Sequence, residues 1–337
     1  MSAPTPVPVT SAPASGTSAQ RVRGRLAART LQRQGTAVVF VLVMIVAWIA
    51  FPNFGTTGNL GNLALDGSFL AVIALGMTFV IITGGIDLSV GSVYALGGVL
   101  AAYGSQWGFF GALLLPLAVC GLIGLLNGFL VARTGMPAFI VTLATLLFAR
   151  GLLLAITDEG ATTYRITESD AFLEIGRGEL FGIGYPVYIA LLLFAAGGVL
   201  LRRTGFGQTL FATGGAEQSA LLMGLPVART KMIVYTLSGL LAGLAGAMTA
   251  AYLESGVTVI GVGLELDAIA VVVIGGTLLT GGAGTVTGTL FGVLLLRVIQ
   301  NVINQIGTLD SNYQSVVSGA FLLVVVVVQR YLSRART

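Results

Sequence analysis

The chain alternates between long apolar segments and short polar or glycine-rich stretches. The apolar segments lie at residues 36–51, 69–83, 90–103, 109–131, 137–156, 187–201, 232–252, 268–280, 286–300 and 316–329. A helix of about 20 mostly apolar residues crosses the hydrocarbon core of a bilayer. The pattern therefore predicts an all-α integral membrane protein with about ten transmembrane segments, the first of them a retained helix rather than a cleaved signal peptide.

Two glycine-rich stretches break this pattern, GGIDLSVGS at 84–92 and GGTLLTGGAGTVTG at 275–288, and the segments that flank them are short. Broken backbone at membrane depth must be buried in protein or line a cavity, because lipid offers it no hydrogen bonds. Glycine pairs also occur where helices pack closely, so a purely structural role stays open. As candidates for a substrate pathway the two breaks contribute Gly84, Gly85, Asp87, Ser89, Gly275, Gly276 and Thr277.

Composition excludes several classes of protein. Of the 337 residues 55% are hydrophobic and 9% are charged, whereas a soluble domain carries about a quarter charged residues. The chain has no histidine and one cysteine, Cys120, which excludes histidine-based metal sites, Ser-His-Asp triads and Cys-x-x-Cys pairs. Its single lysine, Lys231, lies outside any phosphate-binding P-loop motif. We therefore expect no catalysis, no metal or cofactor, no nucleic-acid partner, and an energy source outside this chain.

The basic residues predict the orientation in the membrane. With ten segments and a cytoplasmic N-terminus, the inside loops hold most of the 17 basic residues, and the outside loops hold most of the 13 acidic ones. An excess of lysine and arginine marks cytoplasmic loops, so both termini are predicted to be cytoplasmic. The predicted organisation is a disordered, arginine-rich tail at 1–35, a transmembrane domain at 36–332 and a short cytoplasmic tail at 333–337.

The longest predicted cytoplasmic loop spans about 204–230. We expect a short helix after Gly215, with Ala216, Ala220, Leu221 and Met223 on one face. Two interpretations stay open, an ordinary helix lying on the protein and a peg that docks into a partner. The candidate docking residues are Thr213, Gly214, Gly215, Glu217, Ala220, Met223 and Gly224.

Few ionisable side chains fall in the apolar segments. Asp87 is interpreted as the only deep carboxylate, and it either caps the half-helix that begins near Leu88 or contacts substrate hydroxyls. Arg150, expected to pair with an acid of the outer loop, and Arg297, expected to reach toward the outer surface, are assigned structural roles. The aromatic residues that could stack on a sugar ring, but more often pack in a bundle, are Phe51, Phe54, Phe69 and Phe79.

Three blocks of sequence resemble a known family. They are GMTFVIITGGIDLSVGS at 76–92, ATGGAEQSALLMGLPV at 212–227 and GLELDAIAVVVIGGTLLTGGAGTVTGTLFG at 263–292. Together they resemble the permease subunits of bacterial sugar ABC importers of the ribose and xylose type. FPNFGTTGNLGN at 51–62 is most similar to the second permease subunit of the galactofuranose importer, from which the long tail at 1–35 departs.

The resemblance implies a multi-pass protein of the bacterial inner membrane, surrounded by membrane lipid. It implies four kinds of partner: an ABC ATPase subunit, a second and different permease chain, a periplasmic or lipid-anchored sugar-binding protein, and a monosaccharide substrate. In the family the loop matching 213–224 is the coupling helix that docks on the ATPase. The two glycine-rich breaks would then line the translocation path.

Three other functions remain as alternatives. The first is an ion-coupled secondary sugar transporter, which would act without an ATPase. The second is an intramembrane enzyme acting on a lipid-linked sugar, although the chain lacks a paired acid and base within the membrane. The third is the permease of an amino-acid ABC importer, although neither glycine-rich break carries the positive group that a substrate carboxylate calls for.

Overall fold

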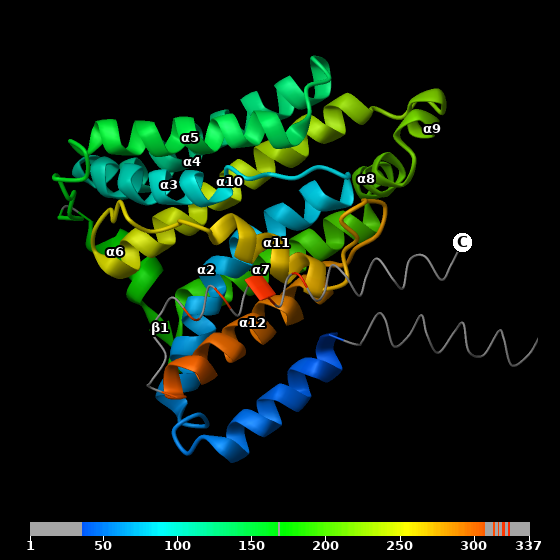
Figure 1. Cartoon of the computed structure of the whole chain (residues 1–337). Helices are drawn as coiled ribbons and strands as arrows, with labels where there is room; N and C mark the ends of the chain where they lie inside the picture. Colours follow the sequence, from blue (N-terminus) through cyan, green and yellow to red (C-terminus); the bar gives the residue numbers. More distant parts are fainter. Residues whose placement is uncertain are drawn as a thin grey trace, which may run out of the picture.

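The computed structural model describes residues 36–306 except Glu168, together with five separate positions between 313 and 323. The predicted tails at 1–35 and 333–337, and most of the predicted segment at 316–329, lie outside these residues. The described chain is almost entirely helical (Figure 1). After a first helix, Thr36–Ala50, come α2 (Thr57–Ile82), α3 (Val90–Gly104), the 3-10 turn η1 (Ser105–Trp107), α4 (Gly108–Arg133), α5 (Ala138–Ile156), α6 (Asp170–Arg177), β1 (Glu179–Leu180), β2 (Ile183–Gly184), α7 (Tyr185–Arg203), α8 (Gly205–Gly215), α9 (Glu217–Leu222), α10 (Val227–Leu253), α11 (Leu264–Ile274) and α12 (Val286–Ile306).

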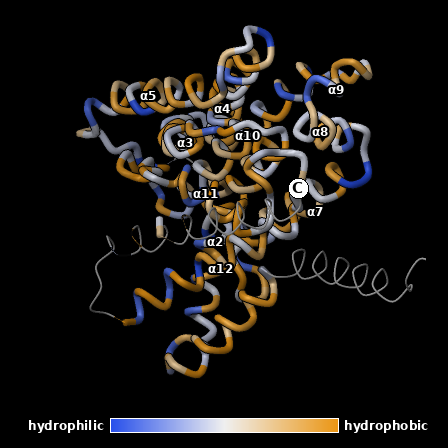
Figure 2. The backbone as a smooth tube through the Cα atoms, turned by 45° about the vertical axis from the view of Figure 1, so that its right-hand side comes forward, coloured by the Kyte–Doolittle hydropathy of each residue, from blue (hydrophilic) through white to orange (hydrophobic). Residues whose placement is uncertain are grey.

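Six helical stretches within the described residues are long and apolar enough to cross a membrane. They are α2, the run from α3 through α4, α5, α7, α10 and α12. Hydrophobic residues run along most of their length, as Figure 2 shows. This confirms an all-α membrane protein, while the count of ten segments and the cytoplasmic side of both termini stay predictions.

One predicted segment is shorter than expected. The apolar run 268–280 predicts a single segment, but α11 ends at Ile274. Gly275 and Gly276 follow directly, and Gly276 has a φ of 89°, which a right-handed helix does not allow. The leucines beyond them belong to the second glycine-rich break.

Helix α10 lies at the centre and packs against α2, α3 and α4. Small residues make this contact close: a Cβ on Gly243 would lie 2.7 Å from that of Cys120 on α4, and one on Gly97 of α3 would lie 2.8 Å from the Cα of Gly243. Helices in lipid associate through such close packing, because burial of apolar surface gives no gain there. In contrast, α5 exposes Phe139, Leu147 and Phe148, as expected for a lipid-facing helix.

The molecule has two distinct ends (Figure 1). Helix α6 and the β1–β2 hairpin lie at one end, where an ion pair joins Arg177 of α6 to Glu254 after α10. Helices α8 and α9 lie at the other end, beside the C-terminal end of α2. Helix α10 runs between the two ends and links them.

Candidate coupling and translocation site

Helix α8 ends directly on the two glycine-rich breaks. A Cβ on Gly214 would overlap the carbonyl oxygen of Ile82, the last residue of α2, and would lie 2.5 Å from the backbone nitrogen of Gly282. The Gly282 N–H in turn donates to the Ile82 carbonyl at 2.9 Å. A Cβ on Gly281 would lie 2.8 Å from the nitrogen of Gly84 and 3.0 Å from the Gly214 carbonyl oxygen. We call these five residues the glycine junction.

The glycine junction brings together backbone from three segments far apart in the sequence. Gly84 adopts a φ of 80°, which turns the chain away from α2 and favours glycine. No side chain separates α8 from the end of α2 or from the second break. We therefore expect a displacement of α8 to act directly on both breaks, because close-packed backbone has little freedom to absorb it.

The first break is held by side-chain hydrogen bonds around Asp87, which is 1% exposed. One carboxylate oxygen accepts from the Ser89 backbone N–H at 3.0 Å and from the Ser89 hydroxyl at 2.6 Å. The other oxygen accepts from the Ser238 hydroxyl of α10 at 2.8 Å. The carboxylate thus binds one free N–H at the start of α3 and joins α3 to α10.

This network continues across the bundle. The Asn127 amide of α4 donates to the Ser89 hydroxyl at 3.2 Å, and the Thr145 hydroxyl of α5 donates to the Asn127 carbonyl oxygen at 2.5 Å. Four helices therefore share one chain of buried polar contacts. The sequence did not indicate that Ser238 and Thr145 belong to this network, because their contacts join residues of separate helices.

The predicted pathway residues differ in their access to solvent. Gly84 and Gly276 are exposed, and Gly85 is partly buried. In contrast, Asp87, Ser89, Gly275 and Thr277 are all buried. The two breaks do meet, at Gly84 and Gly281, but their membership of a pathway stays a prediction.

The predicted coupling loop contains two helices rather than one. Gly214 and Gly215, expected to precede a lone helix, form the last residues of α8, and only Ala216 interrupts the chain before α9. The predicted shared face is wrong: Ala220 is fully buried, whereas Ala216, Leu221 and Met223 are exposed. A helix turns by about 100° per residue, so Leu221 points away from its buried neighbour.

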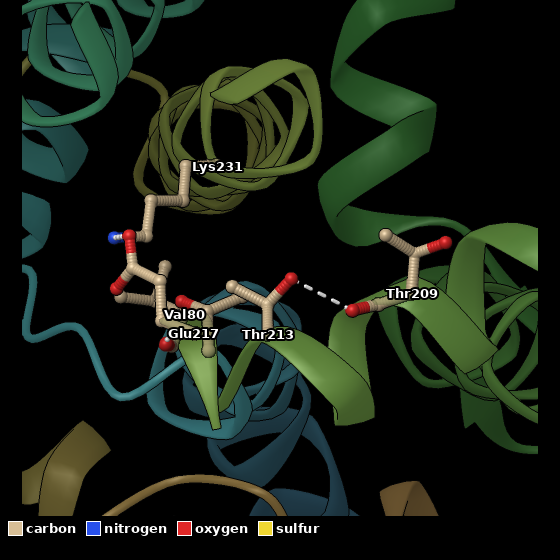
Figure 3. A network of polar contacts seen from close by, with 6 residues as sticks. Val80, Thr209, Thr213, Glu217 and Lys231 are labelled. Atoms are coloured by element: carbon tan, nitrogen blue, oxygen red, sulfur yellow. Dashed lines mark hydrogen bonds and ion pairs between the residues drawn. The ribbon is translucent and has the colours of Figure 1, made fainter. Parts of the chain in front are cut away.

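Polar contacts fix both helices, as Figure 3 shows. The Thr213 hydroxyl donates to the Thr209 carbonyl within α8 at 2.8 Å. Lys231 of α10 forms an ion pair with Glu217 of α9 at 2.7 Å. Gly224, with a φ of 74°, ends the turn after α9. An exposed ion pair contributes only about 0–1 kcal/mol, so this one orients α9 more than it stabilises the fold.

The two arginines of the apolar segments bind differently from expected. Arg150 donates to the carbonyls of Thr258 and Ile260, at 2.8 and 3.2 Å, and forms no direct ion pair with any acidic residue that the structure describes. Arg297, whose reach toward the outer surface stays a prediction, lines a cavity together with Asp66 of α2. Asp66 escaped the sequence analysis because α2 begins at Thr57, well before the apolar run at 69–83.

Within the described residues, no group of three or more His, Cys, Asp or Glu side chains is placed to hold a metal ion. Among the ionisable groups of the apolar segments, Asp87 accepts from hydroxyls and an N–H, and Arg150 donates to backbone carbonyls.

Comparison with known proteins identifies the family. The family model described as "Branched-chain amino acid transport system / permease component" matches residues 59–326. The inner membrane ABC transporter permease protein YjfF of Escherichia coli K12 is 42% identical over 90% of this chain and 93% of its own length. The ribose import permease RbsC of the same strain is 40% identical over 88% of this chain and 93% of its own length.

A more distant relative, the fructose import permease FruG of Bifidobacterium longum, is 35% identical over 96% of this chain and 97% of its own length. The comparison with solved structures gives no match. The family match and these relatives confirm the resemblance to sugar ABC importer permeases of the ribose and xylose type. The chain therefore belongs to the family of non-catalytic, multi-pass inner-membrane permease subunits of bacterial ABC importers, and within it to the ribose-type sugar permeases.

Proposed function

We propose that this chain carries a monosaccharide into the cytoplasm by alternating access driven by separate ATPase subunits. The proposed sugar is galactofuranose or a related monosaccharide such as ribose, xylose or galactose. The proposed assembly contains a second, different permease chain, the ATPase, and a periplasmic or lipid-anchored sugar-binding protein. Relatives named as ribose and fructose import permeases support the substrate class.

The observation that carries this proposal is the glycine junction. The exposed apolar side chains of α9, led by Leu222 at 91% and Met223 at 69%, offer a surface on which an ATPase subunit docks. Movement of α9 passes to α8 through the single residue Ala216 and then to both breaks through backbone contact. ATP binding on the partner thereby changes the geometry at the ends of α2 and α11.

Adjacent glycines of α8 provide a matched test. Gly214→Ala places a methyl group into the Ile82 carbonyl, whereas a Cβ on Gly215 meets nothing within 4 Å. We expect Gly214→Ala to lose most sugar uptake and sugar-stimulated ATP hydrolysis in proteoliposomes holding the whole importer, and Gly215→Ala to keep both. Co-purification of the ATPase with both variants controls for assembly. Full uptake by Gly214→Ala would disprove the role of the junction.

The alternative functions give opposite results in uptake experiments. The description of the family model names branched-chain amino acids, so leucine serves as the competitor. Competition by leucine and not by sugars would replace the proposed substrate class. Uptake that survives ATP depletion but is abolished by an uncoupler would indicate an ion-coupled carrier.

A further inference from the structure

A cavity of about 240 Å³ lies between α2, α3, α10, α11 and α12. Its polar wall is formed by Asp66, Tyr94, Thr249 and Arg297. Thr249 lies near the end of α10 that faces α6, about 27 Å along the helix axis from Lys231 at 1.5 Å per residue. The cavity is therefore separate from the glycine junction, and α10 connects the two.

The Arg297 guanidinium has a hydrogen-bond donor without a partner among the described residues. Its Nη1 donates to the Gln300 side-chain oxygen at 2.9 Å. Its Nε is buried and has no hydrogen-bond partner among the described residues. A guanidinium has five N–H donors, and a buried donor without a partner is rare and costly. The side chain keeps hydrogen-bonding capacity toward a molecule in the cavity.

The charges around Arg297 select against an anion. Asp66 of α2 and Asp267 of α11 both act electrostatically on the guanidinium. Asp66 lies in the same cavity wall as Arg297, so the wall has no surplus positive charge to attract a carboxylate or phosphate ligand. A neutral ligand with several hydroxyls would instead donate to Asp66 and accept from Arg297.

Hydroxyl and aromatic groups complete the wall. The Tyr94 hydroxyl donates to that of Thr249 at 3.0 Å, which leaves oxygen lone pairs for a ligand. Phe69 and Tyr252 also line the cavity, with ring centroids 6.0 Å apart. A sugar ring has an apolar C–H face and a polar edge, which match an aromatic wall beside charged hydrogen-bonding groups.

We propose that this cavity is a transit site for a single monosaccharide, in which Asp66 and Arg297 bind adjacent hydroxyls and Phe69 contacts the ring face. The inference rests on the proposed sugar import. The volume lies below the roughly 300–1,000 Å³ of pockets for drug-sized ligands, so it suits one sugar ring.

Occupancy is measured by protection of an introduced thiol. Leu253 lines the cavity. Leu253→Cys in a Cys120→Ser background therefore places the only cysteine of this chain in the cavity wall. The whole importer is reconstituted and given D-galactose, D-ribose, L-arabinose or D-fructose on the binding protein. We expect the imported sugar to slow modification by a methanethiosulfonate reagent. Val259→Cys, 79% exposed and outside the cavity, is the control whose labelling stays unchanged.

Charge variants test the same site by uptake. Asp66→Asn and Arg297→Gln are expected to lower uptake about 10- to 100-fold, the loss for one hydrogen bond to a charged group. Both should still co-purify with the ATPase and keep ATP hydrolysis stimulated by the binding protein. The matched controls Asp158→Asn and Arg165→Gln alter exposed residues and should transport normally.

The possible outcomes separate the two proposals. Wild-type uptake of a sugar without protection of Leu253→Cys, or with normal uptake by both charge variants, overturns the transit site and leaves sugar import standing. Protection by leucine and not by any sugar overturns the assigned ligand class. If the wild-type importer takes up none of the sugars, sugar import fails, and the assignment of the cavity fails with it.

Discussion

The two glycine-rich breaks look alike in sequence but are held in place by different means. In the first, Asp87 is surrounded by hydroxyls and an N–H from α3 and α10. In the second, Gly275 packs directly on Gly288, and the buried Thr277 hydroxyl has no partner among the described residues. Side-chain hydrogen bonds stabilise the first break, and the absence of side chains stabilises the second.

This difference in contacts predicts different mechanical behaviour for two similar sequences. A hydrogen-bonded carboxylate fixes a geometry, because each partner has a preferred direction. Contact between glycines only fixes how closely two helices approach, and it permits sliding. We therefore expect the second break to move during transport and the first to act as the fixed point. Both breaks meet α8 at the glycine junction. We therefore expect a movement of α8 to act on the fixed first break and on the mobile second break together.

The largest effect is expected at Gly275. Even the methyl group of Gly275→Ala would lie 2.5 Å from the Gly288 carbonyl carbon and the Thr289 nitrogen, so α11 and α12 must separate. Overpacking costs about 1–3 kcal/mol or more, and backbone gives way less readily than side chains do. We expect a loss of about 3 kcal/mol in stability, measured by thermal denaturation of the purified chain in detergent.

The control for this variant is Gly198→Ala on α7, where a Cβ meets nothing within 4 Å. That substitution should leave the melting temperature unchanged or raise it slightly, because alanine favours a helix. Equal stability of Gly275→Ala and the wild type would mean that close backbone contact does not define the second break.

A smaller effect is expected at Asp87, where two substitutions separate stability from charge. Asp87→Ala removes both acceptors and leaves the Ser238 hydroxyl and the Ser89 N–H unpaired, and at about 1 kcal/mol for each group we expect a loss of about 2 kcal/mol. Asp87→Asn keeps one oxygen for Ser89, and its amide donates to the Ser238 oxygen instead. We expect Asp87→Asn to lose about 1 kcal/mol or less and to retain uptake.

Uptake assays alongside melting temperatures decide between capping and substrate contact. An Asp87→Asn variant that melts like the wild type but no longer transports would show that the negative charge acts in transport. The first break would then be more than a fixed point, and the comparison of the two breaks would need revision.

Much of this architecture could be predicted because lipid imposes simple rules. Of the apolar runs predicted up to residue 300, each lies on a helix except the end of 268–280, which falls beyond α11, since a membrane-spanning helix must bury its own backbone hydrogen bonds. Polar partners such as Ser238 and Asp66 could not be predicted. Their role depends on which helices become neighbours, and a single sequence does not encode that in local spacing.

The coupling segment illustrates the same limit. The pair Gly214-Gly215 suggested a loop, because glycine disfavours helix interiors. In the structure both glycines complete α8, and at Gly214 the close approach to the Ile82 carbonyl requires a residue without a side chain. The sequence predicted where the coupling segment lies, and tertiary contacts determine where its helices begin and end.

The smallest effect is expected at Thr277, and it tests directly whether side-chain hydrogen bonds hold the second break. Thr277→Val replaces a buried hydroxyl without a partner by a methyl group of similar shape, so stability should stay equal or rise slightly. The control is Thr78→Val on α2, whose hydroxyl contacts that of Thr289 at 2.8 Å and donates to the Ala74 carbonyl at 2.7 Å. That variant should lose about 1 kcal/mol. Melting temperatures that rank Thr277→Val below Thr78→Val would reveal a polar partner of Thr277 in the membrane. The second break would then rest on side-chain hydrogen bonding as the first does, and the contrast between a fixed and a mobile break would fail.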